Sequence, residues 1–432
     1  MIFKNRFRPI SISLSPNIEP DDVGLVLKLI FSPWKWKNPS KNSGQGENVI
    51  EKLEGEFKKY IGVKYAFSFN SGRSALYAIL KVLNLPKNTE VLLQAFTCNA
   101  VPNPILWAEL NPVYVDCDND FNINIASLRE TLQSNKDSKV LILQHTFGLP
   151  ANMNEVLDIV QQNGLILIED CAHALGAEFN GQKVGSFGKA GFFSFSRDKV
   201  ISSVYGGMVV TSDDEVGESL RQAQADFGMP NRFWIFQQLL HPILLNFIIL
   251  PIYNFLDLGK IFLVLSQLLH ILSKAVHYKE KRGLRPDYFP KALPNALAIM
   301  SLNQFYKLNK FNNHRKKIAE FYYQELQNTQ FILPEPFDLS QGKKNIFLRF
   351  TVKHPNAHEI IYDAWHKENI LLGDWYTSVI APADTKLDQM HYKMGSCPKA
   401  EKLSKITLNL PTHINISMKE AQRIVDFIKR WK

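Results

Sequence analysis

The stretch Gly191-Phe-Phe-Ser-Phe-Ser-Arg-Asp-Lys-Val-Ile-Ser-Ser-Val-Tyr-Gly-Gly-Met-Val-Val210 decides how the rest of the chain is interpreted. An apolar, strand-like run precedes Lys199, and a Gly-Gly turn that opens a second strand follows it. A lysine at a strand end among aromatic and hydroxyl neighbours loses water. This loss lowers the pKa of the ammonium group and frees the amine to form a Schiff base. Most lysines are solvated surface charges, so the motif needs support from other parts of the chain.

Upstream, Gly164-Leu-Ile-Leu-Ile-Glu-Asp170 predicts a buried parallel strand with two acids at its carboxyl end, where open α/β sheets bind their ligands. Asp170 can accept a hydrogen bond from a protonated pyridine nitrogen, and His173 could lie against the face of that ring. The alternative is that Glu169 and Asp170 cap the next helix and that His173 packs in the core.

A third motif, Ser68-Phe-Asn-Ser-Gly-Arg-Ser-Ala-Leu76, is a hydroxyl-rich turn that leads into a predicted helix over residues 75–83. Free backbone N–H groups at the helix start, together with Ser71, Arg73 and Ser74, form an anion site that suits a phosphate. A simple serine N-cap would explain the same residues.

In chain order, the three motifs resemble the phosphate site, ring-nitrogen acid and Schiff-base lysine of the fold-type I pyridoxal phosphate enzymes. More closely, the chain resembles the DegT/DnrJ/EryC1/StrS family of sugar aminotransferases. It nearly meets the family pattern of Ser-Gly-Thr-x-Ala-Leu, Glu-Asp-x-Ala-(Gln/His)-x-x-Gly, and Ser-Phe-x-x-x-Lys followed by Gly-Gly. The resemblance covers most of the chain and continues through residues 89–93, 112–116, 185–188, 368–376 and 408–413.

The resemblance implies pyridoxal 5'-phosphate as cofactor, with Lys199 forming the Schiff base and moving the proton between substrate and cofactor. It implies that Asp170 pairs with the pyridinium nitrogen and that His173 stacks on the ring. The residues that would hold the phosphate are Gly72, Arg73, Ser74 and Ser194. Some relatives have a histidine in place of the lysine and catalyse dehydration, so Lys199 favours transamination.

Three departures from the family pattern stand out. The aromatic residue that usually stacks on the cofactor aligns with Cys98, and Phe96 lies two residues away, so either could face the ring. Arg73 replaces the usual threonine, which adds positive charge and removes a hydroxyl. The Asn-x-Arg motif, through which a partner subunit often reaches the phosphate, has no clean counterpart in residues 284–297.

The fold class follows from the alternation of strand-like segments with helical ones such as 127–134 and 154–162, which predicts a mostly parallel sheet with helices on both faces. After residue 300, a long helical stretch over 301–327, a strand over 347–352, and helices over 358–367 and 417–431 predict a smaller α+β domain. The expected fold is therefore α/β and fold-type I aminotransferase-like. The predicted parts are an N-terminal segment 1–47, a cofactor-binding domain 48–227, an apolar insertion 228–290 and a C-terminal domain 291–432.

Composition agrees with a large enzyme, because 432 residues with 45% hydrophobic content can bury a sizeable core. The four cysteines are widely spaced, so neither a metal site nor a disulfide framework is expected. The stretch over residues 1–10 lacks a continuous apolar core and a cleavage site, which predicts a cytoplasmic protein.

Residues 234–256 contain no Asp, Glu, Lys or Arg, and a second apolar run follows at 261–272. Polar residues and prolines interrupt the first run and the second is too short, which argues against a membrane span. One alternative is a helical hairpin buried against the body or in a homodimer interface. The other is a segment lying in the cytoplasmic leaflet, with the cations of residues 279–285 near anionic lipid.

The net charge of +9 suits membrane contact or a doubly phosphorylated substrate, whereas the scattered lysines argue against nucleic-acid binding. By resemblance, we expect amino transfer from an amino-acid donor, glutamate, to a keto-sugar carried on a nucleotide or lipid phosphate. This reaction would serve surface-glycan or amino-sugar biosynthesis in a homodimer. The alternatives are a non-catalytic, membrane-attached scaffold or regulator and a pyridoxal-dependent sugar dehydratase.

Overall fold

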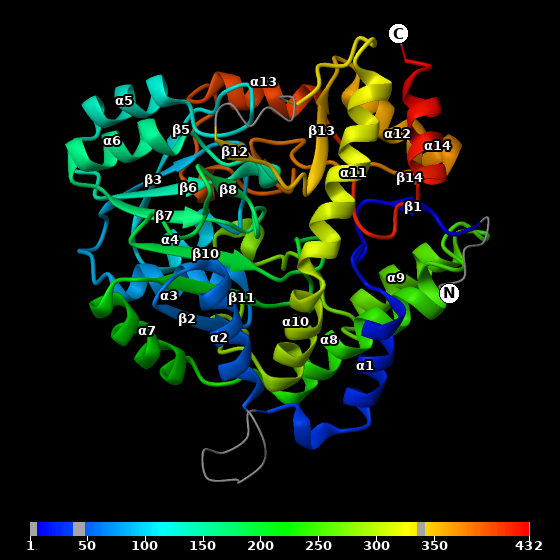
Figure 1. Cartoon of the computed structure of the whole chain (residues 1–432), viewed down its shortest axis with the longest axis horizontal. Helices are drawn as coiled ribbons and strands as arrows, with labels where there is room; N and C mark the ends of the chain where they lie inside the picture. The colour runs from blue at the N-terminus through cyan, green and yellow to red at the C-terminus, as the bar shows by residue number, and fades with distance from the viewer. Residues whose placement is uncertain (1–6, 38–47, 335–341, 432) are drawn as a thin grey trace.

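The computed structural model describes residues 7–37, 48–334 and 342–431 (Figure 1). Its centre is a seven-stranded sheet of order β2-β11-β10-β7-β6-β3-β5. The strands from β10 across to β5 are parallel, and β11 runs antiparallel to both β10 and β2, so the predicted mostly parallel sheet is confirmed. The strands are β2 (Tyr65–Phe69), β3 (Glu90–Gln94), β5 (Asn111–Val115), β6 (Val140–Gln144), β7 (Ile166–Asp170), β10 (Ala190–Ser194) and β11 (Gly207–Thr211).

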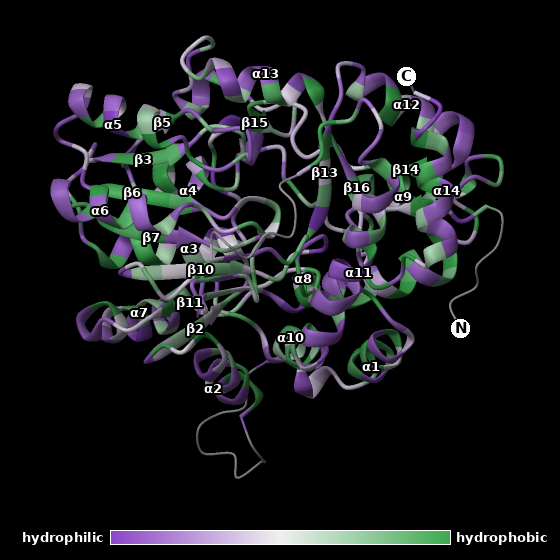
Figure 2. Cartoon of the chain, turned by 45° about the horizontal axis from the view of Figure 1, so that its top comes forward, coloured by the Kyte–Doolittle hydropathy of each residue, from purple (hydrophilic) through white to green (hydrophobic). Residues whose placement is uncertain are grey.

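Helices cover both faces of this sheet, as predicted, because apolar side chains of the central strands pack on both sides (Figure 2). In β6, Val140 and Ile142 belong to one packed layer, while Leu141 and Leu143 belong to the opposite one. The first layer contains α3 (Gly72–Val82), α4 (Pro102–Trp107) and α7 (Asp214–Phe227). The second contains α5 (Ile125–Ser134) and α6 (Met153–Asn163), continued by α2 (Val49–Ile61) and α10 (Asn295–Tyr306).

The C-terminal part packs three of its helices with an antiparallel pair of strands around a core of its own, and its remaining helix packs into a neighbouring apolar cluster. These elements are β13 (Arg349–Lys353), β16 (Thr407–Pro411), α11 (Leu308–Leu326), α12 (Ala357–Glu368), α13 (Pro398–Ile406) and α14 (Met418–Ile428). The helical stretch expected over residues 301–327 is helical, and it is divided at Lys307 between α10 and α11. The Lys307 ammonium lies 2.8 Å from Asp22 and 2.9 Å from Asp21, a tertiary contact that sequence periodicity cannot reveal.

Residues near the N-terminus pack along the C-terminal part. Strand β1 (Ile10–Ser11) pairs in parallel with β14 (Ile370–Leu371), and α1 (Pro20–Ile30) follows it. Residues 1–6 of the stretch analysed as a possible leader lie outside the described residues, and the four-part domain division stays a prediction. The remaining short elements are η1 (Pro33–Lys35), β4 (Thr97–Cys98), η2 (Thr146–Gly148), β8 (Glu178–Phe179), β9 (Gln182–Lys183), β12 (Lys343–Lys344), β15 (Ile380–Ala381) and η6 (Asp388–Met390).

The apolar segment folds into α8 (Arg232–Leu244), a π-helical turn η3 (Leu245–Ile249), α9 (Leu258–Leu268) and the short turn η4 (Glu280–Arg282). Helix α8 places Trp234, Ile235 and Leu239 in the main core, whereas α9 lies at the margin of the molecule (Figure 1). Among the described residues, none of the helices has the length and apolar character that crossing a bilayer requires.

Candidate active site

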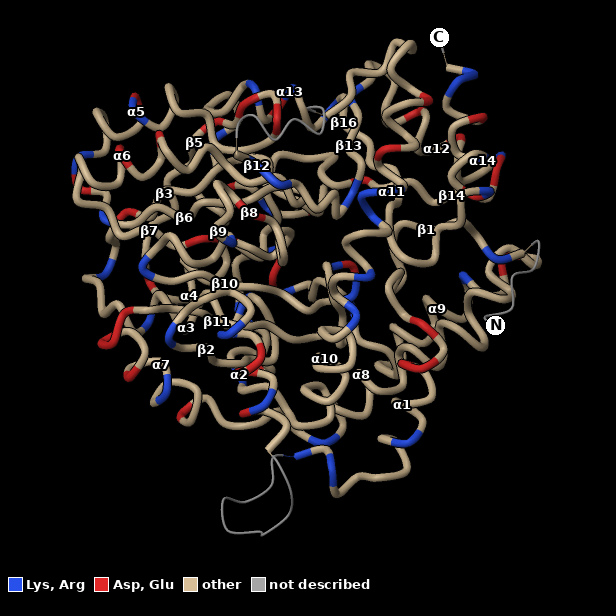
Figure 3. The backbone as a smooth tube through the Cα atoms, viewed as in Figure 1, with Lys and Arg blue, Asp and Glu red and all other residues tan. Residues whose placement is uncertain are grey.

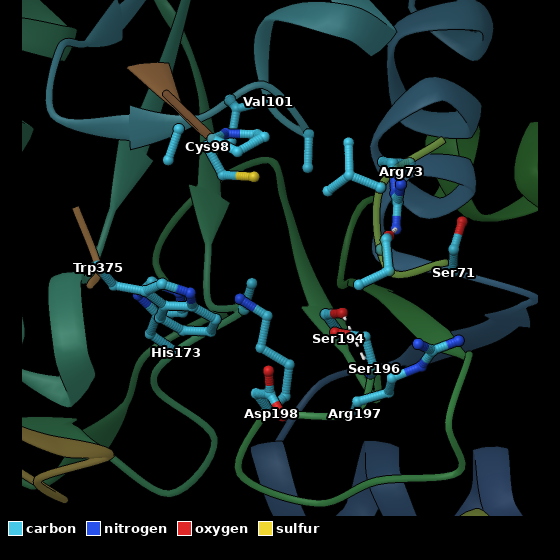
Figure 4. Close-up of a pocket in the computed structure, with 18 of the residues that line it drawn as sticks. Ser71, Arg73, Cys98, Val101, His173, Ser194, Ser196, Arg197, Asp198 and Trp375 are labelled. Carbon is cyan, nitrogen blue, oxygen red and sulfur yellow. Dashed lines mark hydrogen bonds between the residues drawn. The ribbon is translucent and has the colours of Figure 1, made fainter. Parts of the chain in front are cut away.

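A cavity of about 270 Å³ lies at the carboxyl end of β7, beside the loop that follows β10 and the start of α3. Figure 4 shows that its walls differ in chemistry. Ser71, Arg73, Ser194 and Arg197 lie on one side, and the stacked rings of His173 and Trp375 lie on the other. The cavity therefore has a polar, cationic end and an aromatic end.

Lys199 is the only lysine among the residues described as lining this cavity. Burial lowers the pKa of its ammonium group to about 8, while the charge of the Asp170 carboxylate opposes that shift. Its Nζ lies 4.5 Å from the centre of the Trp375 ring. Because the pKa is close to neutrality, a useful share of the amine is unprotonated and nucleophilic.

The backbone around Lys199 is held from two distant parts of the chain. Asn17 Nδ2 donates to the Lys199 carbonyl at 2.6 Å and to the Val200 carbonyl at 3.3 Å. Arg315, from α11, donates through Nη2 to the Val200 carbonyl at 2.7 Å and to Asn17 Oδ1 at 3.0 Å. We call Asn17 and Arg315 the loop clamp, since together they fix the backbone that carries the reactive amine.

The two acids at the end of β7 have different environments. Asp170 lines the cavity, and its Oδ1 accepts a hydrogen bond from the Ala172 backbone N–H at 3.0 Å. Burial raises the pKa of this carboxyl group, so a cationic partner in the cavity would be needed to stabilise its charge fully. Glu169 is fully buried and accepts from the backbone N–H groups of Gly185, Phe187 and Gly188. No helix starts here, so the capping alternative is wrong.

His173 has aromatic neighbours that the sequence did not predict. The Trp375 ring stacks on it with centroids 5.1 Å apart, and the Phe147 ring lies parallel to it at 5.8 Å. Burial lowers the pKa of His173 well below its ordinary value, and its Nδ1 accepts from the Phe147 backbone N–H at 3.3 Å. The imidazole is thus neutral, and Trp375 would have to move if a cofactor ring stacked against it.

Of the two residues that could replace the usual stacking aromatic, Cys98 is the one that lines the cavity. Phe96 is fully buried instead and packs against Phe121, Phe147 and Tyr376. Burial raises the pKa of the Cys98 thiol, so Cys98 contributes a small, uncharged side chain to the cavity lining.

The predicted phosphate residues are brought together only in part. Gly72, Arg73 and Ser194 line the cavity. A Cβ on Gly72 would lie 3.0 Å from Ser194 Cβ, so a larger residue at position 72 would crowd the cationic end of the cavity. Ser74 is not among the lining residues. Its hydroxyl donates to Asn70 Oδ1 at 2.7 Å, and its backbone N–H donates to Ser71 Oγ at 3.0 Å, inside the helix start.

The positive charge of Arg73 is already matched. Arg73 forms a buried ion pair with Glu280, and its guanidinium lies 4.8 Å from the centre of the Phe289 ring. Burial alone would lower the pKa of Arg73, but Glu280 raises it above its ordinary value. Arg73 therefore adds less free charge to the cavity than its sequence position indicates.

Arg197, which sequence reasoning missed, provides the cation that Arg73 does not. Its Nη2 donates to the Ser273 carbonyl at 2.7 Å and to the Ser273 hydroxyl at 2.6 Å. Its buried Nε finds no hydrogen-bond partner among the described residues, and no carboxylate there pairs with it. An unsatisfied guanidinium N–H in the wall of a cavity needs an acceptor such as a phosphate oxygen. The only sequence signal was its place two residues before Lys199.

The fold and the cavity define the class of the molecule. The chain has the fold of the fold-type I aminotransferases, as several solved structures show. One of these is the Helicobacter pylori PseC aminotransferase involved in pseudoaminic acid biosynthesis, with a TM-score of 0.72, 21% identity and coverage of 98% of this chain and 99% of that one. The family model of the DegT/DnrJ/EryC1/StrS aminotransferases matches residues 36–240 and 289–429, and the chain belongs to this pyridoxal phosphate-dependent family.

Two curated relatives act on nucleotide-linked sugars according to their names. The chain is 29% identical to a UDP-N-acetyl-3-dehydro-alpha-D-glucosamine 3-aminotransferase of Acidithiobacillus ferrooxidans, over 88% of this chain and 87% of the relative. It is 24% identical to a GDP-perosamine synthase of Caulobacter vibrioides, over 95% of each protein. The predicted family of sugar aminotransferases is thereby confirmed.

Proposed function

We propose that this chain transfers an amino group from glutamate to a keto-sugar carried on a nucleotide or lipid phosphate, with pyridoxal 5'-phosphate as its cofactor. The observation that carries the proposal is the placement of Lys199, with its pKa near 8, and Asp170 on the walls of one cavity whose far end is cationic. The names of the relatives favour the nucleotide-linked form of the sugar.

The residues of the cavity fit the cofactor. Ser71, Gly72, Ser194 and the unsatisfied Nε of Arg197 would hold the phosphate, and Asp170 would accept the hydrogen bond of the pyridinium nitrogen. When bound, pyridoxal phosphate supplies an aldehyde and an electron-withdrawing ring.

Lys199 has two tasks in this proposal. Its neutral amine would hold the cofactor, and the same Nζ would move a proton from one carbon to another. The low pKa serves both tasks, because the amine can lose and regain a proton near neutral pH. The neighbouring His173 stays neutral and does not compete for that proton.

The test uses the purified chain with a panel of nucleotide-linked keto-sugars and ¹⁵N-labelled glutamate. Transfer of label to one sugar is the expected result. Cofactor binding without label transfer to any sugar, combined with loss of a hydroxyl from the substrate, would identify a dehydratase instead. A chain that binds no cofactor would support the scaffold alternative.

The homodimer and the cytoplasmic location stay proposals, and sedimentation velocity of the holoenzyme tests the first.

The pH dependence of cofactor attachment is a direct prediction of the lowered Lys199 pKa. Only the neutral amine attacks an aldehyde, so the rate at which apoenzyme takes up pyridoxal phosphate should rise about tenfold per pH unit below 8 and level off above it. Because the Asp170 charge raises the Lys199 pKa, Asp170→Asn should move the plateau to lower pH. Stopped-flow absorbance measures both. A rate that keeps rising to pH 10 would mean that the amine is solvated.

Arg197 allows a prediction about affinity. Arg197→Met should weaken pyridoxal phosphate binding by about 10- to 100-fold, the effect of one charge-assisted hydrogen bond. It should leave the affinity for pyridoxal, which has no phosphate, unchanged. Equilibrium dialysis measures both constants, and Arg285→Met, outside the cavity lining, is the matched control. Equal losses for the two ligands would show that Arg197 supports the cavity wall and does not bind phosphate.

A further inference from the structure

Helix α9 presents its apolar side chains outward, the reverse of an ordinary surface helix. Ile261 is 51% exposed, Leu265 49% and Leu268 60%, and the spacing of three to four residues puts them on one face. The side of α9 toward the protein carries Gly259 and Ser266, its two buried residues. The other exposed apolar residues of this outward face are Leu258, Phe262, Val264 and Leu269.

The side of α9 that faces the protein packs too closely for the helix to rotate about its axis and bury its apolar side chains. A Cβ on Gly259 would lie 2.3 Å from the Ile249 carbonyl oxygen and 2.5 Å from Tyr253 Cα, which means that the two backbones touch. Ser266 accepts backbone hydrogen bonds from Ile271 and Leu272 through its carbonyl. An exposed apolar surface of this extent needs a covering partner.

The segment that carries the outward face has an excess of positive charge, which favours an anionic partner. Residues 231–290 contain seven Lys or Arg and three acids. Of the acids, Glu280 is buried against Arg73, Asp257 is paired with Lys260 at 2.8 Å, and Asp287 is paired with Lys279 at 3.3 Å. Lys274 and Arg282 are exposed beyond the end of the helix. If a second copy of the chain docked here face to face, the positive charges of the two copies would repel each other. An anionic lipid surface would instead neutralise these charges.

We propose that the outward face of α9 docks on a lipid surface that carries anionic headgroups. At 11 residues the helix is too short to cross a bilayer, and its apolar side chains suit insertion to the level of the headgroups. The family model leaves residues 241–288 unmatched, so the docking element lies outside the matched core. Figure 3 shows α8 and α9 almost without charged residues, in contrast to α2 and α7.

The docking face is joined to the catalytic cavity through the chain itself. The chain passes from α9 directly into the cavity wall, which contains Ala275 and Val276. Tyr205 donates a hydrogen bond to the Lys274 carbonyl at 2.6 Å, and Arg197 donates one to the Ser273 hydroxyl. These bonds fix the segment after α9 against residues that line the cavity. The proposal does not depend on the amino-transfer chemistry, because lipid binding is measured without substrate.

The experiment is flotation of the holoenzyme with two kinds of vesicle, one of phosphatidylcholine alone and one that also contains about 30% phosphatidylserine. The second kind has an anionic surface that attracts basic protein surfaces. The wild type should float with the anionic vesicles, less so when salt is raised to about 0.5 M. The triple variant Ile261→Ser, Leu265→Ser, Leu268→Ser should bind at least about 10-fold more weakly. Lys274→Ala with Arg282→Ala should also weaken binding.

The matched control is Tyr306→Ser, Ile332→Ser, Met394→Ser, three apolar residues about equally exposed elsewhere, which should float like the wild type. Equal flotation of the α9 variant and the wild type would overturn the proposal, as would absence of wild-type binding. If the wild type does not float and the α9 variant turns a dimer into a monomer in sedimentation velocity, the face belongs to a second copy and the proposal is wrong.

Discussion

Lys199→Ala should abolish amino transfer while leaving the chain folded. The variant removes both the attachment point of the cofactor and the group that moves the proton, and no other lysine lines the described cavity. Proton transfer by a positioned side chain alone contributes about 10²- to 10⁴-fold to a rate, so turnover should fall by at least about 10³-fold. The yellow absorbance of lysine-linked cofactor should disappear, and borohydride should no longer fix the cofactor to the protein.

The stability of this variant separates a catalytic loss from a folding defect. The cavity lowers the Lys199 pKa from 10.5 to about 8, so the fold disfavours the charged amine. That penalty is fully present below pH 8, disappears above about pH 10.5, and amounts to at most about 3 kcal/mol. Lys199→Ala relieves it, so the melting temperature of the cofactor-free protein at pH 7 should not fall.

The control for Lys199→Ala is Lys353→Ala, which removes another buried lysine with a pKa lowered by burial, outside the cavity. It should keep the absorbance and the turnover of the wild type. If Lys199→Ala keeps measurable turnover and the control loses it, the assignment of the reactive amine is wrong.

Glu169→Ala should have the largest effect on stability. The Glu169 carboxylate accepts three backbone N–H bonds of 2.7 to 2.8 Å from the loop before β10, and a contact of 3.2 Å from His145 Nε2. His145 Nδ1 accepts from the Ala151 N–H, so Nε2 carries the proton that points at Glu169. Alanine would leave these buried donors without partners, and the free energy of unfolding should drop by about 3–5 kcal/mol.

Urea denaturation followed by circular dichroism measures this loss. The control is Glu178→Ala, which breaks the half-exposed contacts with Lys183 and Lys344 and should change the free energy of unfolding by no more than about 1 kcal/mol. Similar losses in the two variants would contradict the structural role assigned to Glu169.

The sequence predicted the fold well where apolar runs and turns were long and regular. The buried parallel strand predicted within residues 164–170 contains β7, and the Gly-Gly turn opens β11 at Gly207. The predicted helical stretch after residue 300 is divided at Lys307 into α10 and α11, and the Lys307 ammonium contacts two acids about 285 residues upstream. Local patterns carry no information about such a contact.

The candidate site was predictable where a motif stands next to a strand end. Lys199 and Asp170 both line the cavity, as their positions after β10 and at the end of β7 indicated. Glu280 was taken as part of a surface charge run, yet it is fully buried against Arg73, 207 residues away. The stacking of Trp375 on His173 was equally invisible, because a loop from the C-terminal part brings the two together.

The loop clamp has a practical consequence for how this protein is prepared. Asn17 reaches the catalytic loop from the first twenty residues, a region that is often trimmed or fused to an affinity tag. Trimming past Asn17 would release the carbonyls of Lys199 and Val200 and leave the Arg315 guanidinium with fewer acceptors in the interior. Preparations shortened in this way should take up cofactor poorly, and their inactivity would say nothing about the native enzyme.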